Sequence, residues 1–143
     1  MRRPTLALCV VLGLGMLTGC SGGGPYCDAA DRGEDSLKTF GQLDSAAFTS
    51  YAEVTTDIAK SAPKDVQAEW KAVAKATRRV VAAHDKADIR IQDMTDEEAV
   101  NALSQDDLDR IQAANEAFND TATQRRDLAQ HLHDECGIDL PKK

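Results

Sequence analysis

Three ionisable side chains near the carboxyl end of the sequence have a spacing that suits metal binding. Asp127, His131 and Glu135 stand four residues apart, so in a helix of 3.6 residues per turn they share one face. Carboxylate and imidazole groups on one face can hold a divalent cation. A solvated face explains the pattern equally well, and His131 is then favourably placed near a helix C-terminus. We favour the solvated face, and we predict no metal site and no cofactor.

A second group of acidic residues surrounds two predicted helix starts. Its members are Asp93, Asp96, Glu97, Glu98, Asp106 and Asp107. The cluster lacks the glycine and the ligand spacing of a calcium-binding EF-hand loop. Carboxylates are expected at helix N-termini because they interact favourably with the helix dipole. We therefore predict helix capping here, with calcium binding as the alternative.

Polar residues on otherwise apolar stripes are the remaining candidates for a site. They are His84, Asn115 and Arg125, and polar groups on packing seams must be hydrogen-bonded or paired. We expect Asn115 to fix helix register, and Arg125 to pair with an acid or reach solvent. A small ligand pocket between helices would use the same three residues. The sequence has no nucleophile elbow, P-loop, HExxH motif or dinucleotide fingerprint, and we predict that the protein is not an enzyme.

The first nineteen residues have the composition of a secretory signal. Arg2 and Arg3 precede a run of thirteen mostly apolar residues, 5–17, which is too short to span a bilayer as a helix of about 20 residues. The run ends in Leu17-Thr18-Gly19-Cys20, which resembles the lipobox of bacterial lipoproteins. This resemblance implies removal of residues 1–19 and attachment of diacylglycerol to the Cys20 sulfur. An ordinary secreted protein with an incidental Cys20 is the alternative.

Diacylglyceryl-Cys20 would anchor the mature chain to the extracytoplasmic face of the cell membrane, since two or more acyl chains give durable attachment. Residues 20–26 then form a flexible tether, because 21–25 reads Ser-Gly-Gly-Gly-Pro. Fully extended, this segment reaches about 15–20 Å. Residues 27–143 are predicted to form one helical domain held close to the bilayer.

The charge of the mature chain limits its partners. Residues 1–19 contain two arginines and no acid, which leaves 15 basic and 24 acidic side chains and a formal charge of −9. Phosphates and anionic headgroups repel such a domain, so we predict no nucleic-acid binding. Basic proteins and cations remain possible partners on electrostatic grounds.

Two cysteines remain after removal of the leader and lipidation of Cys20. Cys27 and Cys136 lie near the two ends of the domain, in a compartment where disulfides form. We therefore predict that they are bonded. The alternative is a catalytic or metal-binding pair, which the absence of a CxxC motif disfavours.

Apolar residues recur at helical spacing, and no segment alternates with a period of two. Asp44 or Ser45 can cap a helix that ends at the turn before Pro63. Its predicted inner face is Phe48, Tyr51, Thr55, Ile58 and Ala62. A second helix begins at about Pro63, which suits a first helical position. Its predicted seam is Val66, Trp70, Val73, Thr77, Val80 and His84, with Trp70 in the core.

The rest of the chain is predicted to contain two further helices after a connection at 85–94. Thr95 and Glu98 form a capping box for a short helix that ends at Leu103. A long helix then runs from about Gln105 to Glu135, and Gly137 stops it. The inner stripe predicted for this long helix is Leu108, Ile111, Asn115, Phe118, Ala122, Arg125, Ala129 and Leu132.

Residues 28–43 are predicted to form a short helix with interruptions at Gly33 and Gly41. Its apolar positions are Leu37, Phe40 and Leu43. Three to four helices with short connections favour an all-α, antiparallel up-down bundle. Such a bundle places Cys27 and Cys136 at the same end, where the predicted disulfide closes it.

The overall plan of the sequence also resembles a known group of proteins. After the lipobox, tether and Cys27 come Ala62-Pro63 before the Trp70 helix, and a terminal Cys136-Gly137-Ile138-Asp139-Leu140. This order resembles small helical lipoproteins and secreted proteins of actinobacteria. The resemblance implies location and fold, and no catalytic residue. We expect a non-catalytic module that binds an envelope protein or a small ligand, with a structural or regulatory component of an envelope complex as the alternative.

Overall fold

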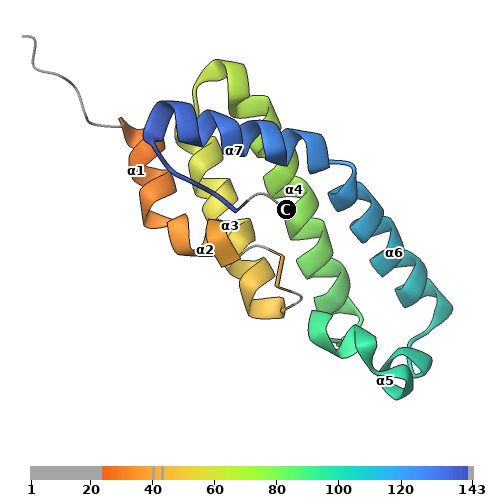
Figure 1. Cartoon of the computed structure of the whole chain (residues 1–143). Coiled ribbons are helices and arrows are strands. Elements are labelled where there is room, and N and C mark those ends of the chain that lie inside the picture. Colours follow the sequence, from red (N-terminus) through yellow and green to blue (C-terminus); the bar gives the residue numbers. More distant parts are fainter. Residues whose placement is uncertain (1–23, 40, 43, 142–143) are drawn as a thin grey trace, which may run out of the picture.

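A computed structural model of the chain describes residues 24–39, 41–42 and 44–141. These residues form α-helices and one short 3₁₀ helix, and no β-strand occurs among them, so the predicted all-α class is confirmed (Figure 1). The elements are α1 (Pro25–Arg32), α2 (Glu34–Thr39), α3 (Ser45–Ser61), α4 (Lys64–Lys86), η1 (Ile91–Thr95), α5 (Glu97–Asn101), α6 (Gln105–Asn119) and α7 (Ala122–Cys136). The predictions for the leader, Cys20, Phe40 and Leu43 lie outside the described residues.

Helices α3 and α4 form the central antiparallel pair. Asp44 caps α3, its side chain accepting a hydrogen bond from the Ala47 amide at 3.0 Å. The extended residue Ala62 ends the helix, since a residue before proline disfavours the helical conformation. All residues predicted for the inner faces of both helices are buried, and the two predictions are confirmed. The start of α3 reaches the segment after α4, where the Ile91 amide donates to Ser45 Oγ at 2.9 Å.

Helix α1 begins within the predicted tether. Pro25 occupies the first helical turn, and Tyr26 is only 6% exposed. The helical domain therefore begins two residues before the predicted boundary at Cys27, because Tyr26 packs into the core. Gly33 separates α1 from α2, as the sequence predicted. A Cβ atom at Gly33 would lie 2.2 Å from Val54 Cγ1, so close approach to α3 requires glycine there.

The long helix predicted from Gln105 to Glu135 is broken in two. Thr121 lies at the break, is 7% exposed, and donates its hydroxyl to the Phe118 carbonyl at 2.7 Å. The Arg125 guanidinium donates to the same carbonyl at 2.5 Å. These bonds compete with the helical acceptor pattern, and the chain turns at Asp120 before α7 begins. The prediction of one continuous helix was wrong.

The η1–α5 segment projects from the end of the molecule that lies opposite α1 (Figure 1). Asp96, and not Thr95, caps α5, accepting from the amides of Glu98 and Ala99 at 2.9 and 3.2 Å. The predicted short helix is present but ends at Asn101, two residues before Leu103. No residue of α5 is buried.

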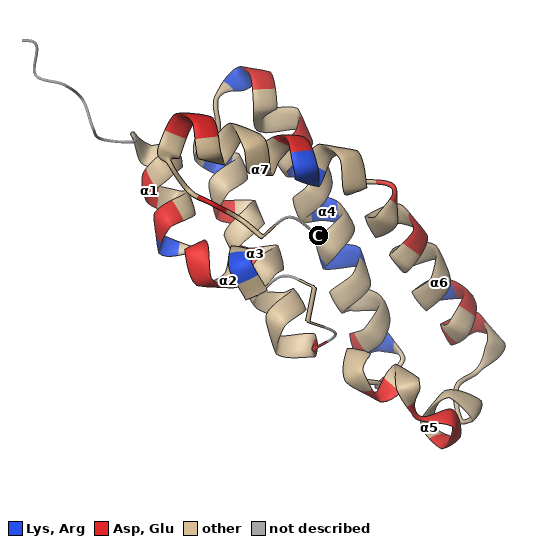
Figure 2. Ribbon diagram, in the orientation of Figure 1, with Lys and Arg blue, Asp and Glu red and all other residues tan. Residues whose placement is uncertain are grey.

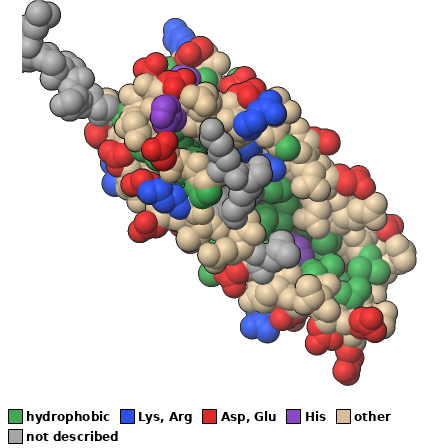
Figure 3. Space-filling view, viewed as in Figure 1, with side chains coloured by type: hydrophobic (Ala, Val, Ile, Leu, Met, Phe, Trp, Pro, Cys, Tyr) green, Lys and Arg blue, Asp and Glu red, His purple; other side chains and the backbone are tan. Residues whose placement is uncertain are grey.

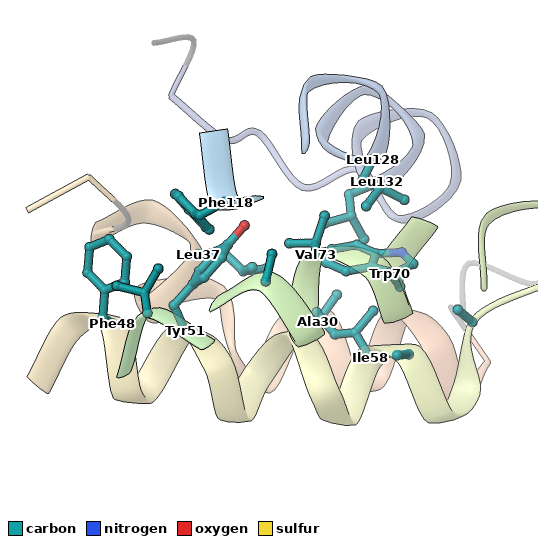
Figure 4. Close-up of a cluster of buried hydrophobic side chains, with 14 of the residues drawn as sticks. Ala30, Leu37, Phe48, Tyr51, Ile58, Trp70, Val73, Phe118, Leu128 and Leu132 are labelled. Atoms are coloured by element: carbon teal, nitrogen blue, oxygen red, sulfur yellow. The ribbon is translucent and has the colours of Figure 1, made fainter. Parts of the chain in front are cut away.

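The core runs along the length of the α3–α4 pair (Figure 4). Trp70, Ile58 and Leu132 lie towards one end of this cluster, and Phe48 and Phe118 towards the other. Cys27 and Cys136 are joined by a disulfide with a Cα–Cα distance of 5.4 Å, within the usual range, and the predicted pairing is confirmed. Gly137 follows α7 with a left-handed φ of 69° and ends it, as predicted. None of the described helices is both long and apolar enough to cross a bilayer.

Candidate functional site

The three residues of the predicted polar pocket lie in different surroundings. His84 belongs to α4 and is 4% exposed, Asn115 is exposed on α6, and Arg125 is half-buried on α7. Asn115 lines a surface hollow whose lining includes neither His84 nor Arg125. The prediction that Asn115 lies on the inner seam was wrong, because Ala114 takes that place between Ile111 and Phe118.

Arg125 stabilises the bend between α6 and α7. Its Cζ lies 4.1 Å from the centroid of the Phe118 ring, and its guanidinium donates to the Phe118 carbonyl and, at 2.6 Å, to Thr121 Oγ1. Tyr51 on α3 is close enough to interact electrostatically with it, and burial raises the Tyr51 pKa to about 12. Burial lowers the pKa of Arg125. Arg125 is therefore a structural cation that fixes the bend.

His84 is a buried titratable group near the end of α4. Its Nδ1 atom has no hydrogen-bond partner, although polar groups on a packing seam usually have one. Burial lowers the pKa of His84, against the opposing effects of a hydrogen bond with the Ile89 backbone and of the Asp85 charge. Burial therefore disfavours the protonated imidazole, and protonation of His84 opposes folding. Thr77 on the same seam follows the usual rule, since its hydroxyl donates to the Val73 carbonyl at 2.8 Å.

A chain of polar contacts joins α1, α4 and α7 beside the disulfide. Trp70 Nε1 donates to the Tyr26 hydroxyl at 3.1 Å. The Tyr26 oxygen also lies within hydrogen-bond distance of His131 Nδ1, at 3.1 Å. His131 Nε2 then faces the Asp65 carboxylate at 3.9 Å. The Tyr26 ring also meets the Trp70 and His131 rings edge-on, with centroids 6.5 and 5.5 Å apart.

These contacts hold α1, α4 and α7 together and leave Tyr26 unsuited to catalysis. Desolvation raises the pKa of Tyr26, and a hydrogen bond from Trp70 opposes that effect. A buried phenol with a raised pKa, shared between two partners, is a poor nucleophile. Trp70 is 2% exposed, and the prediction that it lies in the core is confirmed.

The cation-binding alternative for α7 finds no support. His131 turns towards Tyr26, while Asp127 is exposed and lies 3.4 Å from Arg126. Within the described part of the chain, no group of three or more potential ligands is placed to hold a metal ion.

The acidic residues of the predicted capping cluster form helix caps and ion pairs with residues close to them in the sequence. Asp96 caps α5, Arg90 pairs with Asp93 at 2.7 Å, and Ser104 with Asp107 begins α6.

An open hollow along α6 is the best candidate for a binding site. It has a volume of about 550 Å³ and a mainly apolar accessible surface. Its lining residues are Met94 of η1 and Gln105, Leu108, Asp109, Ile111, Gln112, Asn115, Glu116 and Asn119 of α6. Ile111 is 2% exposed and forms part of the floor, whereas Leu108 and Met94 are half-buried. Hydrophobic side chains are visible in Figure 3 at the same end of the molecule, near α5.

Acidic residues are frequent in this part of the molecule, on α5 and along α6 (Figure 2). Asp109 and Glu116 belong to the hollow itself, and both are exposed. Arg110 is engaged by Asp107, and Arg90 by Asp93. The hollow therefore presents an apolar floor with a negative rim.

Sequence reasoning missed this hollow because it assigned Leu108 to a continuous inner stripe. A signal was present in the sequence. Gln105 and Asp109 repeat as Gln112 and Glu116 seven residues later, which places two amide–carboxylate pairs on one helix face. The sequence does not indicate that Met94 lies against that face of α6 and completes the hollow.

Comparison with known proteins finds no matching family model, no similar curated protein and no similar solved structure.

Proposed function

We propose that this protein is a lipid-anchored, extracytoplasmic module of the cell envelope that binds another protein without catalysing a reaction. One observation carries the proposal: the apolar, acid-rimmed hollow runs along α6, on the flank of the molecule that extends from the α5 end and away from α1. Helix α1 begins five residues after Cys20. Anchoring at Cys20 would therefore hold the α1 end near the bilayer and leave the hollow accessible from the other side.

The direction of the helical segments supports this orientation. We propose an antiparallel up-down order for α1–α2, α3, α4 and α6–α7. Contacts between Tyr26, Trp70 and His131 bring the starts of α1 and α4 to the end of α7. At the other end, Ser45 at the start of α3 contacts Ile91 and Gln92, which follow α4.

A protein partner fits the hollow better than a small molecule. Small-ligand sites usually bury most of their ligand in a concave pocket, whereas this hollow is open and extends along a helix. His84, Asn115 and Arg125 do not line a common pocket, so the small-ligand alternative loses its proposed residues.

The anchor is tested by mass spectrometry of the amino-terminal peptide from membrane fractions. We expect a peptide that begins at Cys20 and carries the mass of a diacylglyceryl group. The Cys20→Ala variant should incorporate no radioactive fatty acid. An intact Met1 peptide, or unchanged labelling of Cys20→Ala, would contradict the proposed anchor.

Partner binding is tested by site-specific photocrosslinking in intact cells. A photoreactive residue at Leu108 in the hollow should give a discrete crosslinked protein band. The matched control is Ala122, which is exposed on α7 and outside the hollow, and it should not give that band. No crosslink at Leu108, or the same band from both positions, contradicts a binding function for the hollow.

A further inference from the structure

The two carboxylates of the hollow form an unneutralised pair with a defined spacing. Asp109 and Glu116 are seven residues apart on α6, which is two helical turns and about 10.5 Å at 1.5 Å per residue. Asp109 accepts from Gln105 Nε2 at 2.7 Å, and Glu116 accepts from Gln112 Nε2 at 2.8 Å. The amide donors orient the carboxylates without cancelling their charge. Neither carboxylate forms an ion pair with any described residue.

The hollow that contains these carboxylates has the length of a helix-binding groove. Lining residues extend from Gln105 to Asn119, which corresponds to about 21 Å along the helix axis. Leu108 and Ile111 project from α6, and Met94 of η1 lies against the same hollow. An amphipathic helix binds such a groove through apolar residues at positions i, i+3, i+4 and i+7.

We propose that the hollow binds a cationic amphipathic helix from another envelope protein. Apolar side chains of that helix enter the hollow against Leu108 and Met94. Two Lys or Arg residues seven positions apart pair with Asp109 and Glu116. This proposal rests on the binding function proposed above and adds the chemistry of the partner.

Charge and shape argue against the other occupants. Anionic lipid headgroups and nucleic acids meet a negative rim and are repelled. A second copy of this chain does present Lys71 and Arg78 on α4 seven residues apart. Between them lies Ala74, which is 2% exposed, so that surface lacks the large apolar side chains needed to fill the hollow.

The test measures binding of a fluorescent peptide to the full mature protein in detergent micelles. The peptide is an amphipathic helix with leucines on one face and two lysines seven residues apart. Asp109→Asn/Glu116→Gln should weaken its binding about tenfold at low salt, which is the effect of two exposed ion pairs together. Asp31→Asn/Glu53→Gln is the matched control. Both of its residues are exposed, lie outside the hollow and form no described ion pair.

The control variant removes the same amount of charge and should leave the peptide affinity within about twofold of the parent protein. Leu108→Gln should weaken binding while circular dichroism shows an unchanged fold. A peptide with its lysines five residues apart should lose the sensitivity to Asp109→Asn/Glu116→Gln. Equal weakening by both double variants would show general attraction to net charge and overturn the proposal. No effect of Asp109→Asn/Glu116→Gln would also overturn it.

The partner captured at Leu108 in cells separates failure of this proposal from failure of the binding function. A crosslinked segment with two basic residues seven apart supports both proposals. A neutral or acidic segment, or a second copy of this chain, leaves a binding function in place but overturns the cationic partner. Absence of any crosslink contradicts the binding function itself.

Discussion

The two ends of this helical domain are built differently. At the α1 end, the disulfide, the Trp70–Tyr26–His131 contacts and the buried Leu132 join three helices. At the α5 end, short elements project from α4, and α5 buries no residue. The disulfide and the polar contacts between helices are concentrated at the α1 end, near the proposed anchor, whereas the α5 end has partly exposed apolar residues that the proposed partner would cover.

Removal of the disulfide is expected to have the largest effect. Its loop spans 109 residues, and in the chain-entropy model such a crosslink contributes about 4–5 kcal/mol. The Cys27→Ala/Cys136→Ala variant should therefore melt about 15–20 °C lower than the parent, as measured by circular dichroism. The same shift should follow reduction of the parent protein. Two free thiols at these positions in the parent, or an unchanged melting temperature, would refute the proposed role of the α1 end.

The contact between α1 and α3 should show the next largest effect. Gly33→Ala places a methyl group against Val54 Cγ1, and such overpacking costs about 1–3 kcal/mol. Chemical denaturation should show this loss of unfolding free energy. The reciprocal variant Gly33→Ala/Val54→Ala should recover part of it, because the clashing methyl groups are gone. A double-mutant cycle with no coupling between the two sites would show that their contact is unimportant.

The accuracy of the sequence predictions also differs from one part of the molecule to another. Helices α3 and α4 are encoded locally, by the Asp44 cap, the Pro63 stop and regular apolar stripes. The disulfide was predictable because Cys27 and Cys136 are the two cysteines outside the predicted leader and lipobox. The bend at Thr121 was not, since the apolar spacing continues through it. Its cause is competition for the Phe118 carbonyl by Thr121 and Arg125.

The hollow could be predicted only in part. The repeat of Gln105–Asp109 and Gln112–Glu116 marks one face of α6 in the sequence. Met94, however, reaches this face only because the chain after α4 folds back as η1. That placement depends on tertiary contacts such as the Ile91 amide bonding to Ser45, which are separated by 46 residues. Long-range placement of a short element is not encoded by periodicity.

Lowering the pH should reduce the free energy of unfolding through protonation of His84, which lies near the end of α4. Burial lowers the pKa of His84 in the folded state, so the unfolded state binds the proton more tightly. Stability is then unaffected by this group above its unfolded pKa near 6.5, and falls as the pH drops below that value. His84→Leu should remove part of the decrease in unfolding free energy between about pH 6.5 and 5.

The matched control for His84 is His133→Asn, because His133 is exposed on α7. This variant should leave the acid dependence caused by burial of His84 in place. Urea denaturation at several pH values measures both variants. An acid dependence identical in His84→Leu and in the parent would show that burial of His84 is not its source.

Loss of the α5 cap should have the smallest effect, and the most local one. Asp96→Ala removes the acceptor for the Glu98 and Ala99 amides, which costs about 1 kcal/mol of helix stability. Because α5 buries no residue, this loss should not reach the global unfolding equilibrium. Hydrogen exchange at the Val100 and Ala102 amides, which bond to the Asp96 and Glu98 carbonyls, should accelerate about fivefold at an unchanged melting temperature.

Ser104→Ala is the contrasting variant. Ser104 caps α6, and because Ile111 of α6 is buried, loss of this cap should lower the melting temperature. If Asp96→Ala lowers the melting temperature as much as Ser104→Ala does, the η1–α5 segment belongs to the same cooperative unit as the core, and the separation between a stabilising end and a recognition end is wrong.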